Sequence, residues 1–158
     1  MARSRTEVDR RVQEFVQTCR RRELKVTHQR MEIFRELAAS EAHPDAETVF
    51  QAVAGRVPSI SRDTVYRTLS TLEAEGLIRR VEPVFESVRY DANVGRHHHF
   101  VCKVCGAIRD FYSEAFDSLP VPPSAESLGQ IDSVQVQIRG ICSTCTHGKE
   151  AMRNRGSR

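Results

Sequence analysis

Four of the five cysteines are arranged in two Cys-x-x-Cys pairs, Cys102 with Cys105 and Cys142 with Cys145. Four thiolates complete the tetrahedral coordination of Zn²⁺ and leave no open position, so the pattern is typical of a structural zinc site. A redox-active pair is the alternative, but such a pair normally occurs once, beside a βαβ unit. The sequence therefore predicts one structural zinc ion per chain. The fifth cysteine, Cys19, is expected to be a small core residue.

Three consecutive histidines, His97, His98 and His99, precede the first cysteine pair. Residues i and i+2 of a strand share a face, so His97 and His99 can bind one ion while His98 points away. Two carboxylates, Asp91 and Asp110, lie nearby in the sequence. Imidazole and carboxylate ligands without a thiolate suit Fe²⁺, Mn²⁺ or Zn²⁺. A polar strand with surface histidines is the alternative interpretation.

A further histidine, His43, stands directly before Pro44 at the start of a predicted helix. Taken alone, its position favours a hydrogen-bonding role at the beginning of that helix. The sequence contains no Ser-His-Asp order, no phosphate-binding Gly-rich loop and no GxGxxG motif. We assign no catalytic residue, and the chain is not expected to be an enzyme.

The spacing of apolar residues predicts four helices in the first half of the chain. A mobile arm over Met1–Arg5 precedes them. The expected helices run from Val8 to the basic residues 20–22, from the cap Thr27 onward, from Asp45 to Gly55, and from the cap Ser61 to Glu75, with Gly76 following. Residues 77–81 and 87–91 then form a β-hairpin. Helices followed by such a hairpin predict a winged helix-turn-helix.

The outward face of the fourth predicted helix carries the groups that contact DNA in a helix-turn-helix. Arg62, Thr64, Tyr66 and Arg67 lie in its first half, which enters the major groove in such motifs. They supply phosphate donors, a partner for the thymine methyl group and a donor for base edges. A solvated polar face is the alternative.

The second half of the chain predicts a small β-rich domain. Strands are expected at residues 100–102, 107–111 and 133–141, with a break at residues 120–123. We therefore predict an α+β protein with a winged-helix domain over residues 1–92, a hinge at 93–96, a small metal-binding domain at 97–146 and a frayed tail at 147–158. About 50 residues bury too little apolar surface to be stable alone, so this domain needs a metal or a partner chain.

Composition excludes several classes of protein. The chain has 158 residues, 39% of them apolar, and a net charge of +3, which is typical of a globular protein rather than a disordered one. No apolar run approaches the roughly 20 residues that cross a bilayer, and no secretory signal follows the N-terminus. We expect a cytoplasmic protein without a membrane partner.

Several segments together resemble the ferric uptake regulator family. They are LKVTHQR at residues 24–30, DTVYRTL at 63–69, RYD at 89–91, HHHFVCKVCG at 97–106 and the late CSTC at 142–145. The resemblance covers roughly residues 8 to 146, and the motifs occur in the family's order. It implies a winged-helix domain joined to a dimerisation domain.

Membership would imply a homodimeric, metal-dependent repressor that binds double-stranded operator DNA. In this sequence, Lys25 is similar to the family's minor-groove lysine, and Tyr66 and Arg67 to residues that contact bases or phosphates. The resemblance also implies a regulatory Fe²⁺ or Mn²⁺ site formed by His43, Asp91, His97, His99 and Asp110.

Asp110 distinguishes between branches of the family. The iron-sensing branch usually has Glu there, whereas the peroxide-sensing branch has Asp, so this sequence resembles the peroxide sensors. In that branch, the equivalents of His43 and His97 are oxidised, which weakens metal binding and releases DNA. The sequence departs from the iron regulators at Arg96 and Val134, where they have histidines, so we expect no accessory metal site.

Three other functions remain as alternatives. An iron or manganese uptake repressor would use the same metal site and release DNA reversibly. A non-haem iron enzyme would use two histidines and a carboxylate as a facial triad but would need an organic-substrate pocket. A zinc-stabilised DNA-binding protein without sensing would bind DNA equally with and without a regulatory metal.

Overall fold

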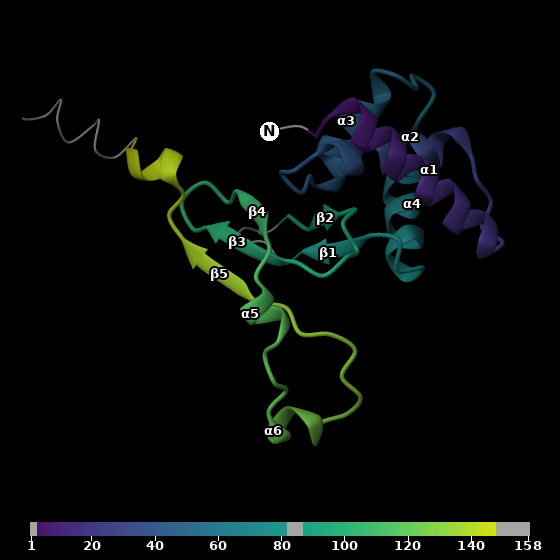
Figure 1. Ribbon diagram of the computed structural model, residues 1–158. Coiled ribbons are helices and arrows are strands. Elements are labelled where there is room, and N and C mark those ends of the chain that lie inside the picture. Colours follow the sequence, from purple (N-terminus) through teal and green to yellow (C-terminus); the bar gives the residue numbers. More distant parts are fainter. Residues whose placement is uncertain (1–2, 82–86, 148–158) are drawn as a thin grey trace, which may run out of the picture. The chain divides into compact units, whose positions relative to one another are not determined.

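The computed structural model describes residues 3–81 and 87–147 (Figure 1). These residues form two compact units that divide between Val94 and Gly95. Helices dominate the N-terminal unit, and a small sheet organises the C-terminal unit. Among the described residues, no helix combines the length and apolar character needed to span a bilayer.

Four helices build the N-terminal unit, and a capping side chain begins each of them. The helices are α1 (Arg5–Arg21), α2 (His28–Ala39), α3 (Ala46–Ala54) and α4 (Arg62–Ala74). The capping oxygens belong to Ser4, Thr27, Asp45 and Ser61, and each accepts a hydrogen bond from the N–H three residues later. Such caps satisfy backbone donors that a helix leaves unpaired at its start.

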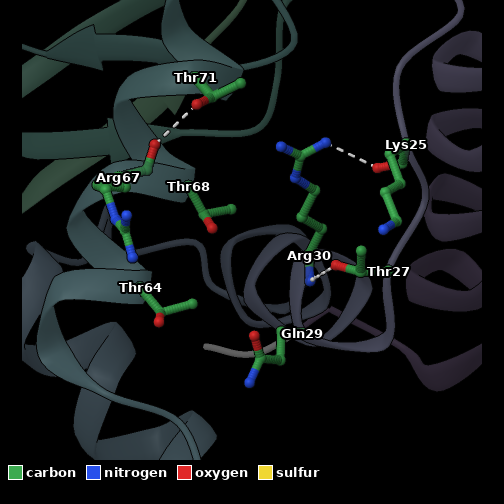
Figure 2. A pocket seen from close by; sticks show the side chains of 8 residues that line it. All are labelled: Lys25, Thr27, Gln29, Arg30, Thr64, Arg67, Thr68 and Thr71. Atoms are coloured by element: carbon green, nitrogen blue, oxygen red, sulfur yellow. Dashed lines mark hydrogen bonds between the residues drawn. The ribbon is translucent and has the colours of Figure 1, made fainter.

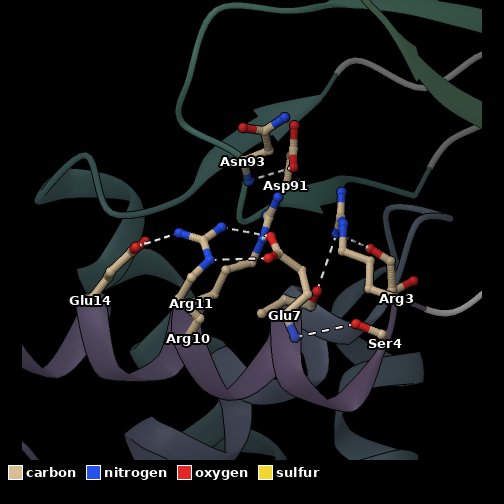
Figure 3. A network of polar contacts seen from close by, with 10 residues as sticks. Arg3, Ser4, Glu7, Arg10, Arg11, Glu14, Asp91 and Asn93 are labelled. Carbon is tan, nitrogen blue, oxygen red and sulfur yellow. Dashed lines mark hydrogen bonds and ion pairs between the residues drawn. The ribbon is translucent and has the colours of Figure 1, made fainter.

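The first helix begins earlier than the sequence predicts, so the expected mobile arm over residues 1–5 is wrong for its described part. Ser4 caps α1, and Glu7 lies within reach of Arg10 and Arg11 on the first turns (Figure 3). The guanidinium of Arg3 donates to two carbonyl oxygens at the end of α2. The apolar pattern misses this turn because its residues are polar and are held by hydrogen bonds.

The core of the N-terminal unit lies between the helices. The Phe15 and Phe34 rings stack with centroids 4.1 Å apart, which joins α1 to α2. Val65 and Leu69 bury one face of α4 completely, so its opposite face is left to solvent. Cys19 is only 1% exposed, which confirms its prediction as a core residue.

A two-stranded antiparallel sheet follows α4. Gly76 adopts φ +66°, a left-handed conformation suited to glycine, and ends the helix where the sequence predicts. The strands are β1 (Arg79–Val81) and β2 (Arg89–Asp91). The turn of the predicted hairpin, residues 82–86, lies outside the described residues. Four helices and this β-ribbon form the predicted winged helix-turn-helix.

The C-terminal unit contains a three-stranded sheet in the order β4-β3-β5. Strand β3 (His98–Cys102) pairs antiparallel with β4 (Ile108–Phe111) and parallel with β5 (Gln137–Gly140). Two short helices, α5 (Glu114–Asp117) and α6 (Pro123–Glu126), lie in the segment between β4 and β5. Residues 143–147 are helical, and the remainder of the predicted frayed tail is outside the described residues.

The last strand is shorter than the alternating pattern over residues 133–141 predicts. Pairing with β3 begins where the His99 N–H donates to the Val136 carbonyl, and Val134 precedes this point. The predicted half-buried face is also wrong for Ile138, whose side chain is 41% exposed. Residues 133–141 alternate with the period of a strand, but the described residues leave the Ile138 side chain partly exposed.

Candidate metal centres and nucleic-acid face

The four paired cysteines converge at one end of the C-terminal sheet. One sulfur from each of Cys102, Cys105, Cys142 and Cys145 lies within 4.8 Å of every other. The Sγ atoms of Cys105 and Cys142 are 3.7 Å apart. Sulfurs bound about 2.3 Å from a tetrahedral Zn²⁺ ion stand about 3.8 Å from one another. The cluster therefore has the donor set and the spacing that zinc requires.

Backbone hydrogen bonds prepare this cluster for a thiolate. The N–H groups of Cys105 and Cys142 lower the pKa of the Cys102 thiol to about 6. Hydrogen bonds to the neighbouring sulfurs of Cys142 and Cys105 raise the pKa of Cys145 to about 12. The Cys102 thiol therefore ionises first, and its negative charge then repels a second thiolate at Cys145. A divalent cation removes that repulsion and allows all four thiols to ionise.

Two histidines and a carboxylate lie close together near the start of β3, in the same sheet as the cysteine cluster. The Nε2 atoms of His97 and His99 are 3.0 Å apart. The Asp110 Oδ1 atom lies 3.7 Å from the first and 3.5 Å from the second. Two nitrogens bound at right angles, each about 2.1 Å from an ion, stand about 3.0 Å apart. The geometry of this trio therefore fits a transition-metal ion.

Neighbouring groups fix the orientation of both imidazoles. The Nδ1 atom of His97 lies 2.9 Å from the Gly95 carbonyl, so it donates there and leaves Nε2 as the ligand. The Nε2 atom of the Gln135 amide is 3.1 Å from Nδ1 of His99 and donates to it in this structure. Metal on Nε2 of His99 would move the proton to Nδ1, and the amide would then have to flip over to accept it with its oxygen. Partners of this kind tune metal affinity.

The middle histidine has a structural role that the sequence analysis did not identify. His98 is fully buried, with the rings of Phe111 and Phe116 each 5.5 Å from its own. Its Nδ1 atom accepts the Val136 N–H, and its Nε2 atom lies 3.2 Å from a carboxylate oxygen of Asp117. His98 thus joins β3 to α5 and to the residue before β5. Phe111 and Phe116 were the sequence feature that could have indicated an apolar environment for His98.

The N-terminal unit also contains a histidine and a carboxylate that lie close to each other. Nε2 of His43 lies 3.5 Å from Oδ2 of Asp91, and both side chains are buried. The other Asp91 oxygen accepts the Asn93 N–H at 2.7 Å, a bond drawn in Figure 3. Burial of an imidazole beside a carboxylate is costly unless both groups are paired or bind a cation.

Strand β2 fixes the loop that carries His43. The Tyr90 N–H donates to the Pro44 carbonyl, and the Arg89 guanidinium donates to the His43 carbonyl. His43 itself has φ +51°, a left-handed conformation that is unfavourable for a residue with a Cβ atom. Surrounding contacts therefore impose this conformation, which is a frequent arrangement at functional sites.

This backbone conformation predicts an unusual order of stability for two variants. We expect metal-free His43→Ala to be less stable than metal-free His43→Gly, by about 1 kcal/mol, because glycine tolerates positive φ. At an ordinary position, alanine would be the more stable of the two. Urea unfolding of both variants measures the difference. Equal stabilities, or a more stable alanine variant, would show that the left-handed conformation costs nothing.

A basic hollow lies between α4 and the start of α2 (Figure 2). Its volume is about 350 Å³, and no carboxylate belongs to its lining. The lining comprises three cationic side chains, four threonines and one amide: Lys25, Thr27, Gln29, Arg30, Thr64, Arg67, Thr68 and Thr71. Cations and hydroxyl donors are the groups that contact nucleic-acid phosphates. The hollow therefore suits a phosphate of the DNA backbone.

The structure brings three of the predicted DNA-binding residues, Lys25, Thr64 and Arg67, into this hollow. It does not bring Arg62 or Tyr66 there; both lie on the exposed face of α4. Arg30 is a lining residue that the sequence analysis did not select. Its guanidinium donates to the Lys25 carbonyl at 2.7 Å, which fixes the loop before α2.

Comparisons with known proteins agree with this architecture. The ferric uptake regulator family matches residues 21–138. The peroxide-responsive repressor PerR of Staphylococcus epidermidis is 30% identical over 87% of this chain and 92% of its own. The transcriptional regulator FurA of Mycobacterium tuberculosis is 34% identical over 85% and 92%. A solved structure, the peroxide stress regulator of Campylobacter jejuni, superimposes with a TM-score of 0.63 at 27% identity, over 82% of this chain and 98% of its own.

A winged helix joined to a small sheet with two kinds of metal-ligand cluster defines a class, the metal-responsive transcription regulators. Within that class, the chain belongs to the ferric uptake regulator family. Members of this family regulate transcription and are not enzymes, so the protein is a metal-responsive transcriptional regulator.

Proposed function

We propose that one regulatory ion, Fe²⁺ or Mn²⁺, binds to both units of the chain at once. Its ligands would be five residues: His43, Asp91, His97, His99 and Asp110. The observation that carries the proposal is the trio in which two imidazole nitrogens lie 3.0 Å apart beside Asp110. The N-terminal unit contributes the buried pair His43 and Asp91. Nitrogen and carboxylate ligands suit both ions.

An ion held in this way would couple metal level to DNA binding. Residues 93–96 would act as the hinge between a DNA-binding domain, residues 1–92, and a dimerisation domain, residues 97–146. Metal binding would favour one arrangement of the two, and affinity for that arrangement would shift the population toward it. In a homodimer, this arrangement would set the spacing of the two α4 helices along an operator.

The same proposal assigns a role to each group of predicted residues. The four cysteines would hold the structural zinc ion. Tyr66 and Arg62 would contact bases or phosphates from α4, and Lys25, Thr64 and Arg67 would contact the backbone from the basic hollow. The protein would act in the cytoplasm, where its thiols stay reduced, and would repress transcription when metal is bound.

We further propose that hydrogen peroxide is the signal. Support comes from Asp110 and from the 30% identity to the PerR repressor of Staphylococcus epidermidis. Bound Fe²⁺ would supply the electrons that break the peroxide O–O bond beside the imidazoles. The net change in His43 or His97 is insertion of one peroxide oxygen at a ring C–H, with release of one water. An oxidised ring is a poorer ligand, so metal affinity would fall and DNA would be released.

The test uses DNA binding under anaerobic conditions, with a duplex selected from a random-sequence pool by the metal-loaded protein. We expect binding with Fe²⁺ and with Mn²⁺, and loss after peroxide only with Fe²⁺. Peptides containing His43 or His97 should then gain the mass of one oxygen. Loss of binding without this mass change would contradict histidine oxidation.

A second candidate function is an iron or manganese uptake repressor, favoured by the match of residues 21–138 to the ferric uptake regulator family. The same five ligands would serve this function. This function predicts DNA binding that depends on metal, survives peroxide without modification and is reversed by chelation. The same experiment therefore separates the two functions.

A further inference from the structure

Arg62, the first residue of α4, is held by two residues of α3. Its Nε and Nη2 atoms donate to the two carboxylate oxygens of Glu47, at 3.0 Å and 2.9 Å. Its guanidinium carbon lies 4.4 Å from the centroid of the Phe50 ring. The Gln51 amide donates to the same carboxylate at 2.7 Å and fixes it in turn. The guanidinium is thus held along one edge and over one face.

This arrangement differs from that of the other exposed arginine of α4. Arg67 pairs with Asp63 one helical turn away, and both side chains are about three-quarters exposed. Flexible exposed pairs of this kind lose their geometry readily. Arg62 combines a two-point contact to another helix with an aromatic ring, which makes its direction much better defined.

The two-point contact also determines which donors remain. Glu47 occupies the edge formed by Nε and Nη2. Nη1 and the outer hydrogen of Nη2 form the end of the guanidinium, and no described residue is recorded as their acceptor. The Arg62 side chain is 60% exposed. A planar pair of N–H donors, held in a fixed direction, matches the two acceptors O6 and N7 of guanine in the major groove.

Two further features place this fork on the surface that meets DNA. Ser61 caps α4, so Arg62 lies in the first turn, the part of a recognition helix that approaches base edges. Glu47 and the half-exposed Tyr66 line a second hollow, of about 290 Å³, beside α4. If α4 enters the major groove as proposed, Glu47 is a carboxylate close to DNA, where its charge opposes binding to phosphates. A positioning role explains what this carboxylate contributes.

We propose that Glu47 and Phe50 position Arg62 so that its free end reads one guanine in each half of the operator. The inference rests on the proposed function and adds to it a source of sequence specificity. Arg62 is the reading residue, and Glu47 and Phe50 are positioning residues. Removing Glu47 then has two opposite effects: affinity for all DNA rises, because a negative charge is lost, while discrimination between bases falls.

The experiment is selection from a random-sequence duplex pool by the full-length, Mn²⁺-loaded protein, followed by sequencing. Wild type is compared with Glu47→Gln, Phe50→Leu, Arg62→Lys and Arg62→Ala. Glu36→Gln is the matched control, because it removes one carboxylate from an Arg–Glu pair, with Arg56, that involves no α4 residue. Thermal unfolding checks that each variant is folded. Glu47→Gln is informative even if Phe50→Leu fails to fold.

We expect wild type to prefer guanine about tenfold or more at one position of each half-site. Arg62→Ala and Arg62→Lys should lose this preference, and Glu47→Gln and Phe50→Leu should reduce it severalfold. Glu36→Gln should leave it unchanged. Arg62→Lys should not restore the guanine preference, because an ammonium group keeps the charge but lacks the two coplanar N–H donors of the guanidinium.

Three results would overturn the inference. In the first, base preference is unchanged in all variants and Arg62→Ala lowers the slope of log affinity against log salt by about one. Arg62 would then be a phosphate contact. Loss of preference in Arg62→Ala but not in Glu47→Gln or Phe50→Leu would remove the positioning role. Enrichment of no sequence by wild type would refute the proposed function, and this inference with it.

Discussion

Replacement of Cys102 by serine should remove the zinc and unfold the C-terminal unit. Cys102 is fully buried, and its sulfur accepts the Cys142 N–H at 3.3 Å, so it connects the end of β3 to the segment that follows β5. An ion that joins Cys105 to Cys142 closes a 37-residue loop. By analogy with a disulfide, such a crosslink contributes about 4 kcal/mol. The small sheet has few other buried side chains with which to replace this contribution.

Elemental analysis and circular dichroism measure this result. Wild type should carry about one zinc ion per chain, and Cys102→Ser should carry none and lose sheet signal. Cys19→Ala is the control, because Cys19 is a buried cysteine in the other unit; it should keep its zinc. A folded Cys102→Ser protein, or a zinc-free wild type with disulfides between the pairs, would contradict the assignment.

The second large effect concerns the histidine pair. His97→Ala and His99→Ala should each raise the Mn²⁺ concentration needed for half-maximal DNA binding by at least about 100-fold. Loss of an outer hydrogen-bond partner of a metal ligand already costs 10- to 100-fold in affinity, and loss of the ligand itself costs more. Fluorescence anisotropy of a selected duplex, titrated with Mn²⁺, measures the change without peroxide chemistry.

The control for this titration is His28→Ala, since His28 is an exposed imidazole of α2. Its DNA affinity can change, but its dependence on Mn²⁺ should not. DNA affinity of His97→Ala that equals wild type, with and without Mn²⁺, would support the alternative of a zinc-stabilised DNA-binding protein without sensing.

Local signals explain which parts of the fold could be predicted. Ser61 marks the start of α4 because its side chain caps the helix, and Gly76 marks the end because it adopts a left-handed conformation. Val65 and Leu69 define the buried face of the helix. Such signals act over a few residues, so a single sequence carries them. The start of α1 was missed because Ser4 caps a turn of polar residues, and hydrophobic periodicity gives no indication of a helix there.

Long-range contacts explain what could not be predicted. The spacing of His97 and His99 indicates a shared face, but their partner Gln135 is 36 positions away from His99. The Glu47–Arg62 pair joins two helices whose register depends on packing of the whole unit. His98 was expected to point away from the metal ligands, but the sequence did not indicate that aromatic side chains bury it there. Pairwise distances of this kind have no local pattern.

The outer side of β5 has a consequence for the dependence of stability on protein concentration. Among the described residues, β5 is an edge of its sheet, and Ile138 and Ile141 beside it are about two-fifths exposed. An open, partly apolar edge is a template for another strand. Association that covers it stabilises the folded chain by mass action. Association of two chains through this edge would make the thermal midpoint fall on dilution, and a cell that makes little of this protein would then keep a larger share of it unfolded.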